Sequence, residues 1–569
     1  MNLKPSGEFL ELVPERPDMI PLQDFQKYKF WRPYQREAIA LALQYFLEDD
    51  IPYVVLNAPT GFGKSLFAMA TSVIFLGLEK GEEGFECTQL HAENCKAYVV
   101  TETKQLQDQY LEDFPELIKT IKGRSNYPCP LLSDPKLGIY MTASECIERA
   151  GQKCPLKGNC PYFQARDEAV RSPVTIHNYS YFLNALNYTR VWPEADLLIF
   201  DEAHLAENKL ADFVEFRITS SQLRLLGVDR LPKIRTPEEL MGFLYELDRK
   251  IASQIVETKE KMLTANKNEL KDLSELLDKL ERFQRKVNFI MAEYDEQGWL
   301  MEVLENTLTL RPIWVHRWGR MLYRHGDYAL FMSATISPKN IELLGIEPED
   351  IAYIEVPAIF PVERRPIVIP EGSPWMNKRN FEKTKYKALK ILDKILDVHF
   401  KLGHKGLIHT SSHEQAEFIM QNSRHKDRLL LASGKTRNSA IEAFKASKEP
   451  VALVSPSLHV GADFKHDLAR FQVIFKVPYP SLGDRRTYIR KEQDPDWFQM
   501  VTGQKLVQAY GRTNRAEDDF SVTYIIDANA VRFKNNPYVP GWFKEAIVDM
   551  PTAIKWLSAF LKEQEQKKS

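Results

Sequence analysis

The sequence predicts an α/β protein with two doubly wound, parallel-sheet domains, and two observations support this fold class. First, short apolar runs of the length of a buried parallel strand end in polar or glycine-bearing loops. Second, helical patterns such as Lys64–Leu76 and Tyr386–Leu402 separate many of these runs. Alternation of strand, loop and helix is typical of a parallel sheet whose two faces are covered by helices.

The expected strands fall into two groups, which we interpret as the two domains. The first group comprises Tyr53–Leu56, Tyr98–Val100, Leu197–Phe200 and Tyr328–Met332. The second group comprises Gly406–His409, Val451–Val454, Phe471–Lys476 and Val522–Ile526.

Composition excludes several classes of protein. The chain has 569 residues, 27% of them charged and 44% hydrophobic, which excludes a wholly disordered chain, a collagen-like fibre and a small disulfide scaffold. No apolar stretch approaches the roughly 20 residues that span a bilayer. Met1–Pro5 has no apolar signal segment, so we expect a cytoplasmic protein that does not engage a membrane. Because the net charge is only −2, a nucleic-acid partner requires a local basic groove.

Two stretches break the alternation of strands and helices. Residues 122–166, the cysteine segment, carry four cysteines, many basic residues and no clear strand. Residues 207–320 are expected to be mostly helical, with a helix start at Thr236–Glu239. A leucine-rich seam follows at intervals of three, four and seven residues, and we interpret it as packed helices of an inserted domain rather than a coiled coil. Its members are Leu263, Leu270, Leu273, Leu277, Leu280 and Val287.

The first expected strand leads into a glycine-rich loop and then a helix, the order that a phosphate-binding loop requires. Glycines let backbone N–H groups turn toward a phosphate, the lysine places a positive charge on the β- and γ-phosphates, and the serine hydroxyl suits Mg²⁺. We therefore predict that ATP binds at Thr60, Gly61, Gly63, Lys64 and Ser65.

A pair of carboxylates ends the strand Leu197–Phe200. Asp201 is placed to hold Mg²⁺ together with Ser65, and Glu202 to orient and deprotonate the attacking water. The carboxyl end of a parallel strand is where open α/β sheets bind ligands. Beside the phosphate loop, a catalytic interpretation outweighs that of a solvated acidic patch.

The second half of the chain supplies Gln508, Arg512 and Arg515, which lie on one face of an expected helix. A guanidinium that reaches the γ-phosphate from a second domain acts as an arginine finger. We assign catalytic roles to these three residues, in preference to an exposed basic helix.

The ordered motifs resemble those of the superfamily 2 helicases. They are Ala58–Ser65, Asp201–His204, Ser333–Ile336 and Gln508–Arg515. Three further segments resemble the XPD/DinG branch of that superfamily. Lys122–Cys129 is similar to the entry into an iron–sulfur domain, Cys154–Arg166 to its exit, and Phe360–Pro366 to the linker into a second motor domain.

The resemblance implies two RecA-like motor domains, the first carrying an iron–sulfur insertion and a helical arch. It implies that the first motor domain comprises residues 1–121, 167–206 and 323–360, with the iron–sulfur insertion at 122–166 and the arch at 207–322. The second motor domain is then 361–569. By position in the motifs, the resemblance also implies that Gln35 contacts the adenine of ATP. Asp463 is implied to bind ATP and couple the nucleotide to the second domain.

The four cysteines of the cysteine segment are Cys129, Cys146, Cys154 and Cys160. Their spacing matches neither the paired ligands of structural zinc sites nor ferredoxin motifs. Four thiolates in a region without an apolar core suit a 4Fe–4S cluster, with zinc as the alternative. We do not expect a disulfide framework, and we interpret Cys87, His91 and Cys95 as parts of a loop.

Basic and aromatic residues around these cysteines are candidates for contacts with single-stranded DNA. Cations track a phosphate backbone without reading sequence, and aromatic rings stack on bases. The predicted contacts are Lys122, Arg124, Arg149, Lys153, Lys157 and Tyr179.

The sequence thus predicts an ATP-dependent, Mg²⁺-dependent DNA helicase with a 4Fe–4S cluster. Through the resemblance, we expect 5′-to-3′ movement on single-stranded DNA and unwinding of tailed duplexes. The alternative is a nucleic-acid-stimulated ATPase that remodels RNA or protein–DNA complexes without unwinding. We expect a monomer in a bacterial or virus-infected cell, with replication or repair proteins as partners. A nuclease and an inactive scaffold fit less well, because no nuclease domain precedes Arg32 and the ATPase motifs are intact.

Overall fold

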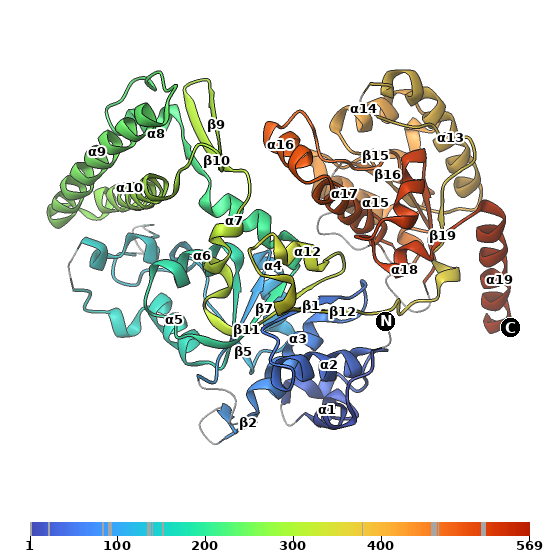
Figure 1. Cartoon of the computed structure of the whole chain (residues 1–569), viewed down its shortest axis with the longest axis horizontal. Coiled ribbons are helices and arrows are strands. Elements are labelled where there is room, and N and C mark those ends of the chain that lie inside the picture. Colours follow the sequence, from blue (N-terminus) through green and yellow to red (C-terminus); the bar gives the residue numbers. More distant parts are fainter. Residues whose placement is uncertain are drawn as a thin grey trace.

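The computed structural model describes residues 3–20, 23–81, 85–88, 94–133, 138, 140–150, 153–377, 379–456, 464, 466–513 and 519–568. Two seven-stranded sheets lie side by side, each with helices on both faces (Figure 1). All strand pairs in both sheets are parallel, which confirms the predicted fold class of two doubly wound, RecA-like domains.

The first sheet has the strand order β12-β1-β11-β7-β4-β6-β5. Its strands are β1 Tyr53–Asn57, β4 Ala97–Thr101, β5 Ile118–Thr120, β6 Val174–Asn178, β7 Ala195–Asp201, β11 Gly326–Ser333 and β12 Ile351–Glu355. We refer to this sheet and the helices covering it as the first motor domain. Sequence analysis had singled out β1, β4, β7 and β11, the central strands, because these are the most continuously apolar.

The second sheet, with its helices the second motor domain, has the order β15-β16-β14-β17-β18-β13-β19. Its strands are β13 Ile367–Val368, β14 Gly406–His409, β15 Leu429–Leu431, β16 Ala452–Ser455, β17 Phe471–Ile474, β18 Val522–Ile525 and β19 Ile547–Val548. The four predicted strands of this group are again the central ones.

The helices are α1 Gly7–Leu12, α2 Gln35–Leu47, α3 Lys64–Leu76, α4 Lys104–Asp113, α5 Pro161–Arg171, α6 Tyr179–Tyr188, α7 Ala206–Val214, α8 Ser220–Leu225, α9 Pro237–Thr264, α10 Lys267–Glu293, α11 Arg320–Tyr323, α12 Pro338–Glu342, α13 Phe381–Lys401, α14 His413–Asn422, α15 Arg437–Ala446, α16 Arg485–Gln493, α17 Pro495–Tyr510, α18 Gly541–Lys544 and α19 Met550–Lys568. Within the described part of the chain, no helix is long and apolar enough to cross a membrane.

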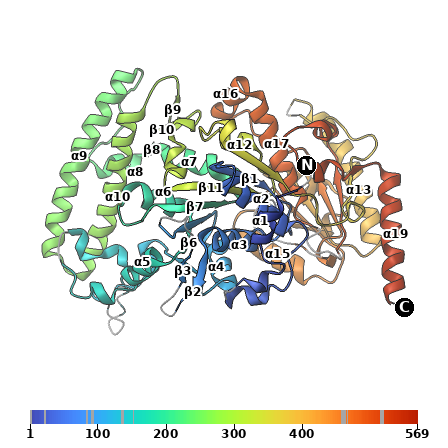
Figure 2. The same ribbon diagram turned by 60° about the horizontal axis from the view of Figure 1, so that its bottom comes forward.

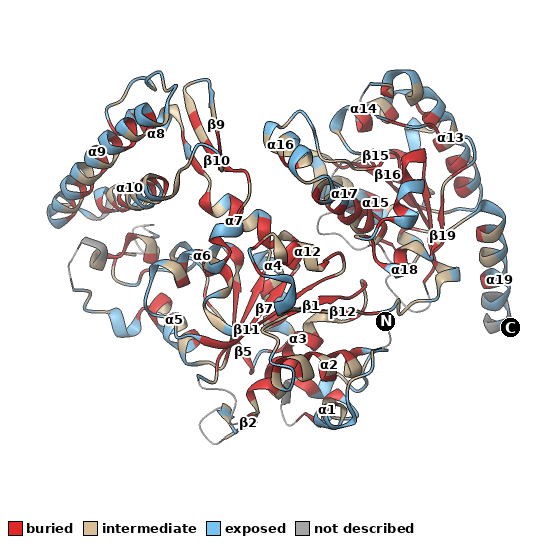
Figure 3. Cartoon of the chain, viewed as in Figure 1, coloured by how far each residue is buried: buried red, intermediate tan, exposed pale blue. Residues whose placement is uncertain are grey.

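Both faces of the first sheet are buried, because successive side chains of its strands enter different apolar clusters. On β1, Val55 belongs to one cluster, whereas Val54 and Leu56 belong to another on the opposite face. Buried residues accordingly concentrate on the strands, and exposed residues on the outer helix surfaces (Figure 3). This two-sided core is why the central strands carry continuous apolar runs rather than alternating ones.

The cysteine segment folds as short 3₁₀ helices on the first motor domain, and its described residues include no extended strand. These helices are Arg124–Asn126, Ala143–Glu145, Ile147–Ala150 and Lys157–Asn159. The last cysteine, Cys160, is the N-cap of α5, which returns the chain to β6. A small apolar cluster of its own includes Cys146, Tyr162 and Phe163.

The helical insertion, residues 207–322, is built on the long helices α9 and α10, which pack against one another (Figure 2). The Thr236 hydroxyl accepts a hydrogen bond from the Glu239 N–H, as the predicted helix start requires. In α10 the seam residues Leu270, Leu277, Leu280 and Val287 are buried and Leu273 is half-buried, but Leu263 near the end of α9 is 55% exposed and does not belong to the seam.

An antiparallel sheet at the base of this insertion was not predicted. Its strands, in the order β8-β10-β9, are β8 Phe216–Ile218, β9 Trp299–Leu304 and β10 Thr307–Pro312. At the other end, the Ser274 hydroxyl of α10 donates to the Ser144 carbonyl, 2.8 Å away in the cysteine segment. The helical insertion therefore contacts the cysteine segment directly.

Candidate functional site

The phosphate loop connects β1 to α3, as predicted. Gly61 and Gly63 both adopt left-handed backbone conformations, with φ of +89° and +82°. A Cβ atom on Gly63 would lie 2.7 Å from the Gln35 amide nitrogen, and one on Gly61 would lie 2.8 Å from the Phe360 ring. Glycine is therefore required at both positions for backbone conformation and for space. Lys64 begins α3, whose N-terminus favours an anion.

Gln35 has a different role from the one expected. Its side chain is fully buried, and its carboxamide nitrogen donates to the carbonyls of Phe62 (2.6 Å) and Gly63 (3.3 Å). Its carboxamide oxygen accepts from the Arg32 N–H at 2.7 Å. In this structure Gln35 therefore helps to position the phosphate loop. Its contact with adenine stays a prediction, for which the second lone pair of the carboxamide oxygen remains.

Asp201 is the last residue of β7 and is 5% exposed. Its carboxylate accepts from the Glu202 N–H at 2.9 Å and from the Tyr110 hydroxyl at 3.3 Å. Burial and the adjacent Glu202 charge raise the pKa of Asp201 from 3.8 to about 6. A carboxylate held in this way is a strong candidate ligand for a divalent cation, whose charge would offset the cost of burial.

We expect Asp201→Asn to stabilise the nucleotide-free protein at pH 7.5 but not at pH 4. The raised pKa means that folding favours the protonated form of Asp201. The contribution of this group to the free energy of unfolding is therefore most favourable below about pH 4 and is lost as the pH rises from there through about 6. Asparagine removes this charge, and a shift of two units corresponds to about 3 kcal/mol at most. Thermal unfolding midpoints of both proteins at the two pH values test this, and an equal difference at both would contradict it.

Glu202 is held in place by contacts from three sides. Its backbone has a φ of +49°, a left-handed conformation that is uncommon outside glycine. Lys64 Nζ lies 3.8 Å from one carboxylate oxygen, and the Ser333 hydroxyl donates to the other at 3.2 Å. Although burial opposes it, the charge of Lys64 and the hydrogen bonds from His204 and Ser333 lower the pKa of Glu202. The carboxylate is therefore ionised and able to accept a hydrogen bond from a water molecule.

A chain of hydrogen bonds joins Glu202 to the second motor domain. Gln508, on α17, donates from its carboxamide nitrogen to Nε2 of His204. With Nε2 as acceptor, the proton of His204 lies on Nδ1, which donates to the Ser333 hydroxyl at 2.8 Å. Ser333 in turn donates to Glu202. Three of the sequence motifs thus meet at one carboxylate.

A small, partly open pocket lies between the two motor domains beside the phosphate loop. Thr60 lines it from the first domain, and Tyr510, Gly511 and Thr513 line it from the second. A Cβ atom on Gly511 would lie 3.2 Å from the Thr60 hydroxyl, so the end of α17 reaches the loop. Arg512 directly follows that contact. Asp463 and Arg515, also predicted for this site, lie outside the described residues.

Two residues at this site escaped sequence analysis. Tyr110 bonds to Asp201 and also to the Ser65 hydroxyl, so it connects the two expected Mg²⁺ ligands. Arg32 donates from its guanidinium to the Gly61 carbonyl. Arg32 precedes Gln35 by three residues, a proximity that could have indicated a shared function, whereas Tyr110 reaches the site only through the packing of α4.

The four cysteines of the cysteine segment are all free thiols, and three of them are buried. Burial raises the pKa of Cys129, and the nearby Cys146 and Cys160 raise it further. Burial likewise raises the pKa of Cys146, to which Cys154 also contributes. Within the described part of the chain, no three His, Cys, Asp or Glu side chains are placed to hold a single metal ion. The 4Fe–4S cluster expected on these four thiols therefore stays a prediction.

The other two cysteines, Cys87 and Cys95, form a disulfide that sequence analysis did not foresee. It joins the end of β3 (Phe85–Cys87), which pairs antiparallel with β2 (Leu78–Lys80), to the residues just before β4. His91 lies outside the described residues.

The predicted DNA-contacting cations near the cysteines differ in their surroundings. Lys122 and Lys157 form ion pairs, with Asp108 at 2.6 Å and Glu148 at 3.0 Å. The Arg124 guanidinium lies 4.6 Å from the centre of the Tyr162 ring. Lys153 is exposed, and the side chain of Arg149 lies outside the described residues.

Phe163 brings several of these cations together. Lys157 lies 5.0 Å and Arg166 4.8 Å from the centre of its ring, and Arg124 lies 5.7 Å away. The ring itself is 6% exposed, so it anchors cations at the surface and does not offer a face to a base.

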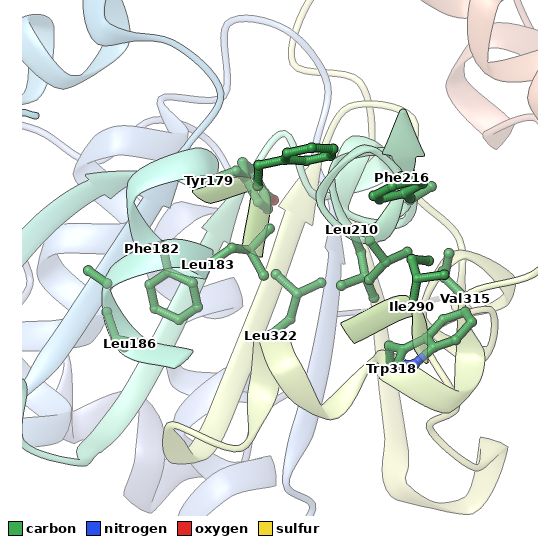
Figure 4. Close-up of a cluster of buried hydrophobic side chains, with 14 of the residues drawn as sticks. Tyr179, Phe182, Leu183, Leu186, Leu210, Phe216, Ile290, Val315, Trp318 and Leu322 are labelled. Atoms are coloured by element: carbon green, nitrogen blue, oxygen red, sulfur yellow. The ribbon is translucent and has the colours of Figure 1, made fainter. Parts of the chain in front are cut away.

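Tyr179 corrects one expectation. Its side chain is 1% exposed and stacks on Phe200, 6.0 Å away, and its hydroxyl donates to the Asp201 carbonyl. Figure 4 shows it in a buried cluster with side chains of α6, α7 and α10. Its ring is therefore not available to stack on a nucleobase.

Two family models match the chain. One, described as a helicase C-terminal domain, matches residues 395–546. The other, described as the res subunit of type III restriction enzymes, matches residues 29–225. These ranges fall in the second and first motor domains.

The chain is also similar to curated proteins and to solved structures that are named as helicases. A probable ATP-dependent helicase of Methanocaldococcus jannaschii is 21% identical over 89% of this chain and 94% of its own length. The ATP-dependent DNA helicase YoaA of Escherichia coli is 27% identical over 36% of this chain and 38% of its own length. Among solved structures, an XPD helicase has a TM-score of 0.57 and 14% identity, covering 91% of this chain and 99% of that one.

Proposed function

We propose that the chain is an ATP-dependent superfamily 2 helicase of the XPD/DinG type, which moves 5′ to 3′ on single-stranded DNA and unwinds tailed duplexes. The observation that carries the ATP-driven part of this proposal is the hydrogen-bonded chain from Gln508 through His204 and Ser333 to Glu202, whereas the polarity comes from the resemblance to the XPD/DinG branch. It links the candidate water-activating carboxylate to the other motor domain. Chemistry at the nucleotide is thereby coupled to the relative position of the two domains.

In the mechanism we propose, the loop amides and Lys64 hold the β- and γ-phosphates at the N-terminus of α3. Ser65 and Asp201 would hold Mg²⁺, which neutralises phosphate charge when bound. Glu202 orients the attacking water and accepts its proton, while Ser333 and Lys64 hold the carboxylate in place. Arg512 and Arg515 would approach the γ-phosphate from the second domain.

The relay supplies a physical reason for coupling. If the domains separate, His204 loses its bond from Gln508, and the tautomer that donates to Ser333 is no longer enforced. The Glu202 carboxylate then loses part of the support that keeps it ionised and oriented. Hydrolysis is therefore fastest with the domains together and slower after they move apart, the cycle that a motor on single-stranded DNA requires.

The polarity of movement is tested by unwinding. We expect duplexes with a 5′ single-stranded tail to be unwound in the presence of ATP and Mg²⁺, and those with a 3′ tail or blunt ends to be unwound far more slowly. Fluorescence of strand-separated labelled oligonucleotides measures this directly. Efficient unwinding of only the 3′-tailed duplex would overturn the proposed polarity, and ATP hydrolysis without any unwinding would favour the remodelling alternative.

The cysteine segment, residues 122–166, is proposed to be held together by a 4Fe–4S cluster on Cys129, Cys146, Cys154 and Cys160. The segment has only a small apolar cluster, so thiolate ligation would contribute much of its stability. Because this segment contacts α10 through Ser144 and Ser274, the cluster would also support the helical insertion.

We expect Cys154→Ser to lose iron and sulfide and most unwinding while keeping much of the DNA-independent ATPase. The phosphate loop and Glu202 belong to a different part of the first motor domain, so they do not need the cluster. Iron and sulfide analysis, with the visible absorption of anaerobically purified protein, measures the cluster. The matched control is Cys87→Ser, which removes a disulfide partner and should retain iron. Stoichiometric zinc in place of iron would contradict the proposal.

A further inference from the structure

Helix α16 of the second motor domain contacts the segment in which the chain returns from the helical insertion to the first motor domain. This return segment is Arg311–Trp314. At the start of α16, the N-cap residue Asp484 accepts from the Arg311 guanidinium at 3.1 Å. At the end of α16, Gln493 accepts from the Trp314 indole N–H at 2.6 Å. Both ends of α16 are therefore attached to the return segment.

Arg490 occupies the middle of this contact and is almost completely buried, with 2% of its surface exposed. Its Nε donates to the Ile313 carbonyl, and its Nη2 donates to the Glu207 carboxylate at 2.6 Å. The guanidinium lies 4.6 Å from the centre of the Trp314 ring and 5.1 Å from that of Trp497. One side chain of the second domain thus contacts the return segment, α7 and α17.

Glu207 connects this contact to the nucleotide site. It lies in the first turn of α7, three residues after His204 and five after Glu202, and is 6% exposed. The short segment 201–207 is therefore held by the second motor domain at two points. Gln508 holds His204, and Arg490 holds Glu207.

The charges around this contact make its geometry specific. Arg486 also faces Glu207, at 3.9 Å, and burial together with the Arg490 charge lowers the pKa of Arg486 to about 10. A buried carboxylate and guanidinium must be desolvated together, and removal of one leaves the other uncompensated. The pair therefore favours one relative placement of α16, α7 and the return segment over all others.

We propose that Arg490 and Glu207 are positioning residues that transmit movement of the second motor domain to the helical insertion. This inference rests on the proposed helicase function and extends it. When ATP draws the domains together or releases them, α16 moves with its domain. Through Arg490, it moves the return segment and, with it, β10 and the base of the insertion. Rigid elements joined by buried contacts carry coupling of this kind.

Three variants test the proposal. Arg490→Met removes the charge and both hydrogen bonds, and Glu207→Gln neutralises its partner. The double variant removes both charges of this buried pair and leaves Arg486 the neighbouring charge of Asp484. The double variant distinguishes a loss of coupling from a loss of stability, because replacement of both members of a buried pair is tolerated better than replacement of one. The matched control is Lys339→Gln, which breaks an ion pair between α12 and Asp494 (2.8 Å) that joins the domains without touching the return segment.

We expect the double variant to keep a wild-type thermal midpoint and near-normal basal ATPase, while duplex unwound per ATP hydrolysed falls about 5- to 150-fold, the range of a typical coupling free energy. Arg490→Lys should not rescue coupling, because an ammonium cannot bond Ile313 and Glu207 in the same fork. Lys339→Gln should unwind like the wild type. If the single variants lose both stability and unwinding, and the double variant regains both, the pair has a purely structural role and the proposal is overturned.

A second readout does not depend on unwinding. Fluorophores placed by amber suppression at Lys261, on α9, and at Lys394, on α13, report the distance between the insertion and the second domain. We expect a non-hydrolysable ATP analogue to change energy transfer in the wild type and in Lys339→Gln, and the change to be lost in the double variant. A retained change would refute the inference. If the wild type shows the change yet unwinds no tailed duplex, the proposed function fails while the inference stands.

Discussion

Glu202→Gln is expected to bind ATP with nearly unchanged affinity and to reduce turnover by about 10²- to 10⁴-fold, the usual contribution of a general base. Glutamine has the same shape and can still accept from Ser333, but it cannot take a proton from water. The largest effect should fall on kcat, because the phosphates are held by Lys64 and the loop amides rather than by this carboxylate.

Two measurements separate this result from a folding defect. Binding of a fluorescent ATP analogue should remain. The thermal midpoint should fall only slightly, since glutamine fits the space and loses only the charge contact with Lys64. The matched control is Glu102→Gln, which alters another carboxylate paired with a lysine, Lys209, at 3.4 Å. Near-normal hydrolysis by Glu202→Gln would show that a different group activates the water.

Arg512→Lys is expected to lower DNA-stimulated kcat by about 10³-fold or more, the size of an arginine-finger effect. Lysine keeps the charge but lacks the planar fork that engages two phosphate oxygens at once. We assign this role to Arg512 because of its position. The preceding residue, Gly511, lies against Thr60 of the phosphate loop although it belongs to the second domain.

Arg512→Lys should change KM for ATP much less than kcat, because the guanidinium acts on charge that develops in the transition state. Steady-state ATPase with saturating single-stranded DNA measures both parameters. Arg532→Lys is the control, since Arg532 lies over the Trp375 ring at 5.5 Å and is exposed. An equal, modest loss in both variants would remove Arg512 from the catalytic set.

Residues that act through local sequence were predicted well. The phosphate loop needs left-handed glycines and a helix start within a few residues, and Gly61, Gly63 and Lys64 adopt those conformations. Asp201 ends its strand as expected, and the central strands of both sheets were found because burial on two faces demands continuous apolar runs. The helix start at Thr236 was likewise predicted from four consecutive residues.

Predictions failed where a side chain's surroundings come from distant parts of the chain. The sequence did not indicate that the Gln35 carboxamide bonds to Arg32 and to the phosphate-loop backbone, whereas its expected contact with adenine stays a prediction. Tyr179 was expected at the surface, but α6 turns it into the core. The short strands β13 and β19, with two residues each, carry too few side chains to show a pattern.

The sequence by itself determined the fold class, the phosphate loop and the paired carboxylates, because each depends on residues adjacent in the chain. Only the tertiary structure decided how these parts act together. Gln508 and His204 are 304 residues apart, and Arg490 and Glu207 are 283 apart. Contacts over such separations are fixed by how two sheets and an insertion pack, which no local pattern of hydrophobicity or charge encodes.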